Sequence, residues 1–375
     1  MARGKLFLLF FLASALLACA VACGGWSRSH SPLPAADDDN DDNNDQSPDD
    51  DDDNDDDFWS AMTSGTTADL NAVWGRSPSD VFAVGLDLMA SAGVVLHFDG
   101  AAWSAVATGA TTAWLSGVWA AGADVFAVGA EDNGSSNPTI GAVLHDDGAA
   151  WSEATNLAST RLNGVWGSAA ADVFAVGMSS AMAGVILHYD GSAWSAMTSP
   201  ATAELWGVWG SAADDVFAVG NDANLNSVWG AVLHFDGSTW SAMTVAKTVG
   251  VLSGVWGSSA ADVFAVGDSG AILHCDGAVW SPMTSGIAAE LSGVWGASTT
   301  DVFAIGAGGV ILHYDGDSWS PTHSGVAADL FGVWGSSAAD VFAVGGEGTI
   351  LHFGGGTPPP PREARRAPPR HGEGL

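Results

Sequence analysis

Short apolar segments recur along most of the chain, and glycine or Asp-Gly separates each segment from the next. Each complete repeat contains four of them, for example residues 252–257 (Leu-Ser-Gly-Val-Trp-Gly) and 262–267 (Asp-Val-Phe-Ala-Val-Gly) in the fifth repeat, and 311–314 (Ile-Leu-His-Tyr) and 319–320 (Trp-Ser) in the sixth. Val, Ile, Phe and Trp favour packed strands, and Gly and Asp-Gly favour tight turns. The pattern therefore predicts four short strands in each repeat, and it lacks the 3.6-residue period of an amphipathic helix.

The first segment marks the period of the repeat. Its tryptophan occurs six times within Val-Trp-Gly and once within Val-Trp-Ala, at Trp74, Trp119, Trp166, Trp209, Trp256, Trp295 and Trp334. Successive tryptophans are 45, 47, 43, 47, 39 and 39 residues apart. A period of about 40 residues that is rich in glycine and aromatic residues is typical of β-propeller blades.

The number of segments indicates how the repeats close on themselves. The second and third segments each occur seven times, ending at Gly345 and Phe353. Within residues 58–354 the Trp-Ser segment also occurs seven times, but it begins at Trp59, before the first complete repeat, and is missing from the last one. We therefore expect residues 58–63 to supply the outer strand of the last blade, which joins the ends of the ring and removes an open sheet edge. The prediction is an all-β fold, a seven-bladed β-propeller of four-stranded blades over residues 58–354, with an eight-bladed ring cut short at its C-terminus as the alternative.

Asp-Gly pairs lie between the third and fourth segments of six repeats, at Asp99, Asp147, Asp190, Asp236, Asp276 and Asp315. The sequence Asp-Gly-x-x-Trp, as in residues 99–103, resembles the Asp-box, Ser-x-Asp-x-Gly-x-x-Trp, with one residue fewer between Asp and Gly. Over residues 58–354 the repeats are similar to those of secreted bacterial β-propellers of the BNR/Asp-box and YVTN-like group. The resemblance implies that this turn joins the third and fourth strands of each blade.

The N-terminal residues predict the compartment. Arg3 and Lys5 precede an apolar run, residues 6–18, and small residues follow, which is the pattern of a secretory signal. The segments that end in Cys19 and Cys23 resemble a bacterial lipobox; we favour Cys23 as the acylated residue, with Cys19 as the alternative. Residues 1–22 are then a lipoprotein-type signal peptide, and the protein is secreted across the inner membrane and lipid-anchored at the outer membrane or cell surface. A plain signal peptide and an uncleaved anchor are the other interpretations.

Acidic residues dominate the rest of the chain. The formal net charge is −33, and residues 37–57 contain 14 aspartates. Because it has almost nothing apolar to bury, the segment 23–57 is predicted to be a disordered tether. It lacks the Gly and Glu of an EF-hand loop, so we expect at most weak, non-specific Ca²⁺ binding. Within residues 58–354, 3 basic residues stand against 27 acidic ones, a balance that excludes a nucleic-acid partner. The tail, residues 355–375, is rich in Pro and Arg and is also predicted to be disordered.

The recurrent polar residues favour structural roles over catalysis. Each repeat has one histidine on its third segment and one aspartate at the start of its second, and copies on separate blades do not converge on one metal ion. The histidines are His97, His145, His188, His234, His274, His313 and His352, and the aspartates are Asp80, Asp124, Asp172, Asp215, Asp262, Asp301 and Asp340. We expect each imidazole to hydrogen-bond a neighbouring strand or turn and each aspartate to accept backbone N–H groups. No metal and no cofactor are expected. Cys275, at a position that most other blades give to Phe or Tyr, is expected to be buried and unpaired.

The resemblance to Asp-box propellers also implies sialidases as the enzymes to consider. Sialidases bind the substrate carboxylate with three arginines and use a tyrosine nucleophile, whereas residues 58–354 contain two arginines, Arg76 and Arg161, and two tyrosines at a repeated strand position. The segment 267–270 (Gly-Asp-Ser-Gly) resembles the surroundings of a serine nucleophile, but the next two repeats have a glycine-rich tight hairpin there. We therefore predict a protein that is not an enzyme. A glycosidase-like carbohydrate-active enzyme, which requires only two carboxylates, is the alternative.

Binding is the function that remains. The connections between the second and third strands are short in repeats five to seven and long in repeats one to four, and in propellers these loops share a face with the blade-to-blade connections. The candidate ligand-binding residues on the long loops are Glu131, Asp132, Asn133, Asn137, Asp222, Asn224, Asn226 and Trp229. Polar amides beside a tryptophan suit a protein loop or a sugar. We predict a monomeric platform that binds an envelope protein or glycan and that meets the membrane through its lipid anchor only; neutral variation of surface loops is the competing interpretation.

Overall fold

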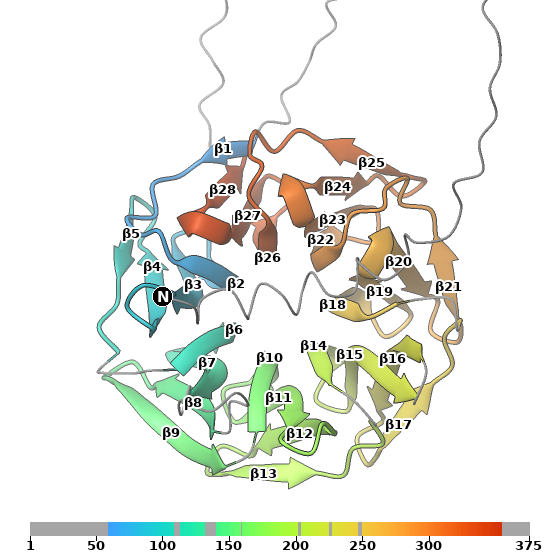
Figure 1. Cartoon of the computed structure of the whole chain (residues 1–375), viewed down its shortest axis with the longest axis horizontal. Helices are drawn as coiled ribbons and strands as arrows, with labels where there is room; N and C mark the ends of the chain where they lie inside the picture. Colours follow the sequence, from blue (N-terminus) through green and yellow to red (C-terminus); the bar gives the residue numbers. More distant parts are fainter. Residues whose placement is uncertain are drawn as a thin grey trace, which may run out of the picture. The chain divides into compact units, whose positions relative to one another are not determined.

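The computed structural model describes residues 59–108, 113–131, 140–158, 160–201, 204–224, 227–246 and 250–354, with the side chains of 140, 154–158, 223, 224, 227 and 228 outside the description. The described residues form seven four-stranded antiparallel sheets arranged as blades around a central channel (Figure 1). The predicted all-β, seven-bladed β-propeller is therefore confirmed, and the eight-bladed alternative is wrong. Among the described residues, no helix is long and apolar enough to cross a membrane.

The blades follow one another along the chain, and each begins with its innermost strand. Blade 1 contains β2 (Asp69–Ser77), β3 (Asp80–Asp87), β4 (Ala92–Phe98) and β5 (Trp103–Ala105); blade 2 contains β6 (Ala113–Ala121), β7 (Asp124–Glu131), β8 (Ile140–Asp146) and β9 (Trp151–Ala158); blade 3 contains β10 (Thr160–Ala169), β11 (Asp172–Ser179), β12 (Gly184–Tyr189) and β13 (Trp194–Met197); blade 4 contains β14 (Leu205–Ala212), β15 (Asp215–Asn224), β16 (Ser227–Phe235) and β17 (Trp240–Met243).

Blades 5 to 7 are more regular, because a single turn of 3-10 helix joins their second and third strands. Blade 5 contains β18 (Leu252–Ser259), β19 (Asp262–Gly267), η1 (Asp268–Gly270), β20 (Ala271–Cys275) and β21 (Trp280–Met283); blade 6 contains β22 (Leu291–Ser298), β23 (Asp301–Gly306), η2 (Ala307–Gly309), β24 (Ile311–Tyr314) and β25 (Trp319–Thr322); blade 7 contains β26 (Leu330–Ser337), β27 (Asp340–Gly345), η3 (Gly346–Gly348) and β28 (Ile350–Phe353).

The ring closes through the N-terminal strand. Strand β1 (Trp59–Ala61) lies beside β28 as the fourth strand of blade 7, with Trp59 opposite Phe353. The Trp59 indole is buried, with its ring 5.8 Å from that of Phe303 in blade 6. Closure by the segment after the Asp-rich stretch is thus confirmed.

The predicted Asp-Gly turns join the third and fourth strands. In blade 1, Asp99 Oδ1 accepts the N–H groups of Ala101 and Ala102 at 2.9 Å, and Gly100 has a φ of +91°, which an L-residue rarely adopts. These N–H groups hold the pKa of the Asp99 carboxyl below its usual range. The same turn recurs at Asp147, Asp190, Asp236, Asp276 and Asp315.

Aromatic side chains hold neighbouring blades together. The strand-two Phe of one blade packs on the outer-strand Trp of the next; Phe174 and Trp240, for example, have ring centroids 6.1 Å apart in an edge-to-face arrangement. Cys275 is buried at the third-strand position that holds an aromatic residue in most blades, as predicted.

Candidate binding face

The ring has two faces of different character. What we call the hairpin face carries the connections between second and third strands together with the connections from one blade to the next. The two kinds of connection touch: the Gly348 N–H of η3 donates to the Ala68 carbonyl, 2.8 Å away in the segment that enters blade 1. The opposite face, which we call the turn face, carries the Asp-Gly turns and the turns between first and second strands. The long loops of blades 1 to 4 therefore gather on the hairpin face.

The long connections are mainly prolonged β-hairpins. In blade 4 the pairing of β15 with β16 continues to Asn224 opposite Ser227, and Asp222 lies opposite Trp229 on this extension. Glu131 is half-buried at the end of β7 in blade 2, on a separate hairpin. The structure thus brings together two of the predicted ligand-binding residues, Asp222 and Trp229, with the backbone of Asn224 beside them. Asp132, Asn133, Asn137 and Asn226 lie outside the described residues.

A polar cluster at the junction of blades 3 and 4 was not predicted as a site. Arg161 precedes the buried Leu of its inner strand, and it forms an ion pair with Glu204, the equivalent residue of blade 4. The Arg161 guanidinium lies 5.6 Å from the centroid of the Trp206 ring, a cation–π contact. The Asn163 amide donates to Glu204 Oε1 and to the Leu205 carbonyl, each at 2.8 Å.

The blade-4 hairpin borders this cluster directly. The Asn221 N–H at its base donates to the Glu204 carbonyl at 3.0 Å. Two buried polar atoms here, the Arg161 Nε donor and the Asn221 Oδ1 acceptor, have no hydrogen-bond partner within the part of the chain that the structure describes. A buried polar atom without a partner costs free energy, so each of these atoms would gain from a hydrogen-bond partner.

The sequence signal for the cluster is a departure from the repeat. The residue before the inner-strand Leu is Asp69, Trp114, Arg161, Glu204, Val251, Glu290 and Asp329 in blades 1 to 7, so blade 3 alone has a cation there. The sequence alone identifies Arg161 as one of two arginines within residues 58–354, too few for a sialidase, and predicts no site here. Its pairing with Glu204 depends on the contact between two blades, which the sequence of one repeat does not reveal.

The opposite side of the hairpin face is acidic. Glu290 of blade 6 is partly buried, and this burial, together with the charges of Asp268 and Asp329, raises the pKa of Glu290 to about 7. Burial also raises the pKa of Asp268, whose Oδ2 accepts the Val251 N–H at 3.2 Å. Asp329 Oδ1 accepts the Gly308 N–H at 2.7 Å. Two of these carboxylates therefore tie down backbone segments of the hairpin face in blades 5 to 7.

The central channel is narrow. A cavity of about 160 Å³ is lined by inner-strand residues of all seven blades, among them Val73, Val165 and Val333. Sites for drug-sized ligands occupy about 300–1,000 Å³. The channel is too small for such a ligand.

The seven histidines pair with the seven strand-two aspartates. Each His Nε2 lies 2.6–2.8 Å from Asp Oδ1 within its own blade, so the predicted structural contact with a neighbouring strand is confirmed. The predicted partner of the aspartate was wrong, because these carboxylates accept side-chain donors. In blade 5 the second oxygen accepts the Ser258 hydroxyl at 2.6 Å. The serine therefore contacts Asp262 and not His274, which is not the Ser-His-Asp order of a catalytic triad.

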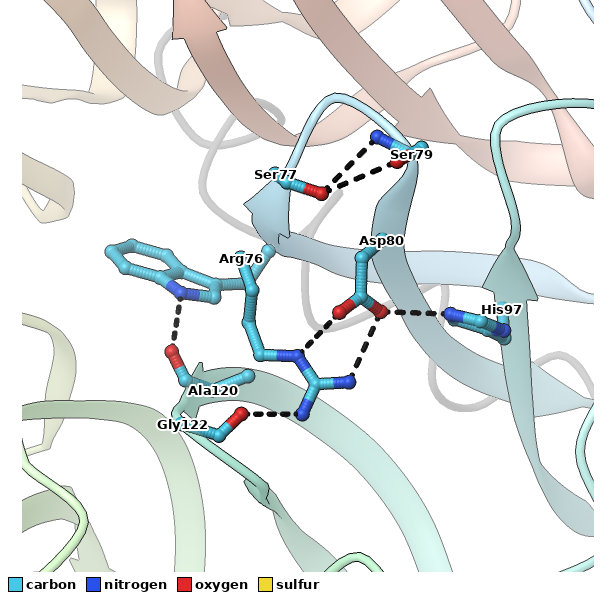
Figure 2. Close-up of polar contacts among 8 residues, drawn as sticks. Arg76, Ser77, Ser79, Asp80, His97, Ala120 and Gly122 are labelled. Atoms are coloured by element: carbon cyan, nitrogen blue, oxygen red, sulfur yellow. Dashed lines mark hydrogen bonds and ion pairs between the residues drawn. The ribbon is translucent and has the colours of Figure 1, made fainter.

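Blade 1 replaces this serine with Arg76, on the turn face (Figure 2). Arg76 Nε donates to Asp80 Oδ2 at 2.6 Å, and Nη1 reaches the Gly122 carbonyl of blade 2 at 2.8 Å. His97 approaches the other oxygen of Asp80. Arg76 thus links blades 1 and 2 and holds the pKa of the Asp80 carboxyl below its usual range, against the effect of burial. Among the described residues, no group of three or more His, Cys, Asp or Glu side chains is placed to hold a metal ion.

Comparison with solved structures places the fold among known β-propellers. The chain is similar to YCF48 from Cyanidioschyzon merolae, with 17% identity, a TM-score of 0.60 and coverage of 79% of this chain and 98% of that chain. It is also similar to YCF48 bound to D1 peptide (15% identity, TM-score 0.60, 79% and 94% coverage) and to the WD40 β-propeller domain of Doa1 (10%, 0.61, 78% and 95%). No family model and no curated protein matches the sequence. At these identities the likeness shows the fold, a seven-bladed β-propeller repeat structure.

Proposed function

We propose that this protein is a secreted lipoprotein whose propeller is a non-catalytic platform that binds a partner through the hairpin face. The observation that carries the proposal is the cluster of Arg161, Glu204, Trp206 and Asn221 at the junction of blades 3 and 4. It combines an ion-paired guanidinium, an aromatic ring and two buried polar atoms that have no partner among the residues described. Such a combination is typical of a recognition site rather than of a repeat that only packs.

We choose a protein partner over a glycan. The Arg161 Nε donor and the Asn221 Oδ1 acceptor have no partner among the described residues, and a peptide amide supplies a complementary C=O and N–H, as sugar hydroxyls also can. A solved propeller of similar architecture, YCF48, binds a peptide, and this supports the choice.

The direction of the chain suits attachment to a membrane. Strand β1 begins at Trp59, opposite the end of β28, and third strands end at the turn face. The chain therefore enters the ring on the turn face. In the sequence, the proposed acylation site Cys23 precedes this point of entry.

The test uses the full chain as bait against a detergent extract of the cell envelope, with a glycan array in parallel. We expect a captured protein whose retention falls by at least about tenfold with Arg161→Ala, the size of effect seen when a central interface arginine is removed. Glu347→Ala, a change of charge on the acidic side of the same face, is the matched control and retains the partner. Equal retention by Arg161→Ala and wild type contradicts the site, and binding to the array but not to protein favours a glycan.

A carbohydrate-active enzyme is the second candidate, because one observation favours it. Glu290, with its pKa raised to about 7, lies near the charges of Asp268 and Asp329, and a protonated carboxyl beside an ionised one is the arrangement of a glycosidase acid. Incubation with envelope polysaccharides tests it. New reducing ends that disappear with Glu290→Gln support this function, and their absence with wild type contradicts it.

A further inference from the structure

The outer strand of blade 2 differs from the outer strands of the other blades. Strand β9 has 8 residues, whereas β5, β13, β17, β21, β25 and β1 have 3 or 4. It runs along the rim as the longest outer arrow in Figure 1. Its first half corresponds to the Trp-Ser segment of the other blades, and its second half is additional.

The additional half is made from chain that other blades use as a connection. After blade 3, β13 ends at Met197 and the inner strand of blade 4 begins at Leu205. After blade 2, β9 ends at Ala158 and the inner strand of blade 3, β10, begins at Thr160. Residues 155–158 pair with residues 140–143 of the prolonged β8, from Thr155 opposite Val143 to Ala158 opposite Ile140. The prolonged β8 therefore pairs with residues that other blades use as the blade-to-blade connection, and these residues become part of the sheet.

The hydrogen-bonding ladder shows which backbone groups of β9 face outwards. In blade 7 the Met62 N–H donates to the Ile350 carbonyl at 2.9 Å, and bonded pairs alternate along an antiparallel ladder, so Ser60 also bonds inwards. Ser152 is the equivalent of Ser60. Between the pairs Leu144–Glu153 and Val143–Thr155 the ladder contains a bulge, because β9 has one extra residue there. The bulge shifts the alternation along β9 by one residue. The residues whose backbone N–H and C=O groups face away from β8 are therefore Trp151, Glu153, Asn156 and Ala158.

No described strand pairs with the outer edge of β9. Strand β9 is the last strand of its sheet, and β8 is the one described element with which it shares extensive contacts. Natural proteins protect exposed sheet edges from pairing with other chains by proline or lysine residues on the edge strand, or by keeping that strand short. Here β21 and β25 contain Pro282 and Pro321, and the remaining outer strands are short. Strand β9 contains neither proline nor a basic residue.

We propose that β9 is a docking edge for an extended segment of a partner protein, which adds to blade 2 as a fifth antiparallel strand. Backbone N–H and C=O groups at the outward positions provide the binding, as in other cases of strand addition. The exposed Glu153 on this strand, and a net charge of −33, favour a segment with a basic side chain opposite Glu153. This surface lies on the rim of blade 2 and goes beyond the proposed site at the junction of blades 3 and 4.

The experiment selects short random linear peptides displayed on phage against the full chain and measures the selected peptides with two variants. Asn156→Pro removes one outward N–H, while the matched Asn156→Ser keeps it. We expect Asn156→Pro to weaken binding by at least about fivefold, the effect of one lost hydrogen bond and the accompanying distortion, and Asn156→Ser to bind like wild type. Methylation of every second backbone amide nitrogen in the peptide removes N–H donors that strand addition needs. We expect it to abolish binding to the wild type and to both variants.

Several outcomes overturn the proposal. Selected peptides that bind Asn156→Pro as tightly as wild type, or that tolerate methylation of every second amide, do not pair with β9. A failure to select any peptide, together with a dimer in sedimentation that Asn156→Pro dissociates, assigns the edge to a second copy of the chain instead. Glu153→Pro, before the bulge, serves the same purpose if Asn156→Pro unfolds. Arg161→Ala is expected to leave peptide binding unchanged, which separates this proposal from the proposed function.

Discussion

At the scale of single residues, the glycine of Val-Trp-Gly is a contact point between blades. A methyl group added to Gly257 would lie 2.8 Å from Cη2 of Trp209 in the preceding blade and 2.6 Å from the Asp262 carbonyl oxygen. The same overlap exists at Gly75, Gly167, Gly210, Gly296 and Gly335. Blade 2 has Ala120 here, and the Trp74 indole N–H donates to the Ala120 carbonyl at 3.1 Å. The glycine thus repeats because the indole of the previous blade occupies the place of its side chain.

A pair of alanine substitutions tests this contact. Gly257→Ala introduces a methyl group into the indole, and we expect it to lower the free energy of unfolding by about 1–3 kcal/mol, as overpacking usually does. Gly346→Ala is the matched control, because the nearest atom to its added methyl group is 3.6 Å away. Urea unfolding followed by tryptophan fluorescence measures both variants. Coincident midpoints for the two would contradict the packing argument.

The raised pKa of Glu290 predicts a dependence of stability on pH. A carboxyl whose folded pKa is about 7, above the ordinary glutamate value of 4.5, binds its proton more tightly in the folded state. Its contribution is complete below about pH 4.5 and is lost as the pH rises to about 7. Glu290→Gln should therefore raise the thermal midpoint relative to wild type at about pH 8 and leave it unchanged at about pH 4. Because the side chain is partly exposed, we expect a gain below about 1 kcal/mol. An equal difference at both pH values would refute the assignment.

At the scale of elements, the repeat predicted most of what the structure shows. Alternating apolar segments and turn residues identify the strands, and the Asp-Gly turns and tight hairpins lie where the sequence places them, because these features depend on residues close together in the chain. The Arg161–Glu204 pair joins residues 43 positions apart on different blades. The extension of β9 depends on pairing with the far end of a prolonged hairpin. Neither is encoded in the local pattern, so both were missed.

The length of the blade-4 hairpin provides a prediction at this scale. Replacement of residues 221–230 by Asp-Ser-Gly, the tight connection of blade 5, removes Asn221, Asp222 and Trp229 but keeps the strands on either side. We expect an intact fold by circular dichroism and loss of the partner captured by wild type. The same replacement of residues 86–93 in blade 1 is the control and should retain the partner. If the blade-4 variant still captures it, the blade-4 hairpin does not contribute to the site.

At the scale of the whole molecule, the first and last strands of the propeller meet in one blade. Blades 1 to 6 are each built from one continuous segment, whereas blade 7 combines β26, β27 and β28 with β1 from the other end. Neighbouring blades contact each other around the ring, so stability resembles a sum of blade and interface terms until the ring closes. Closure joins two segments that are far apart in sequence, and it therefore makes the whole ring cooperative.

Removal of one tryptophan at the closure tests this cooperativity. Trp59→Ala deletes a side chain that is 2% exposed and that packs on Phe303 and Phe353, so we expect a loss of about 3–5 kcal/mol. Trp240→Ala removes the equivalent tryptophan of blade 4, where the chain is continuous. Both variants lose similar packing, but only Trp59→Ala frees the β1–β28 pair. Hydrogen exchange should then show β28 amides opening before the other blades in Trp59→Ala, and a more even loss of protection in Trp240→Ala. If the two patterns match, the N-terminal strand contributes packing alone, and cooperativity arises from the blade interfaces.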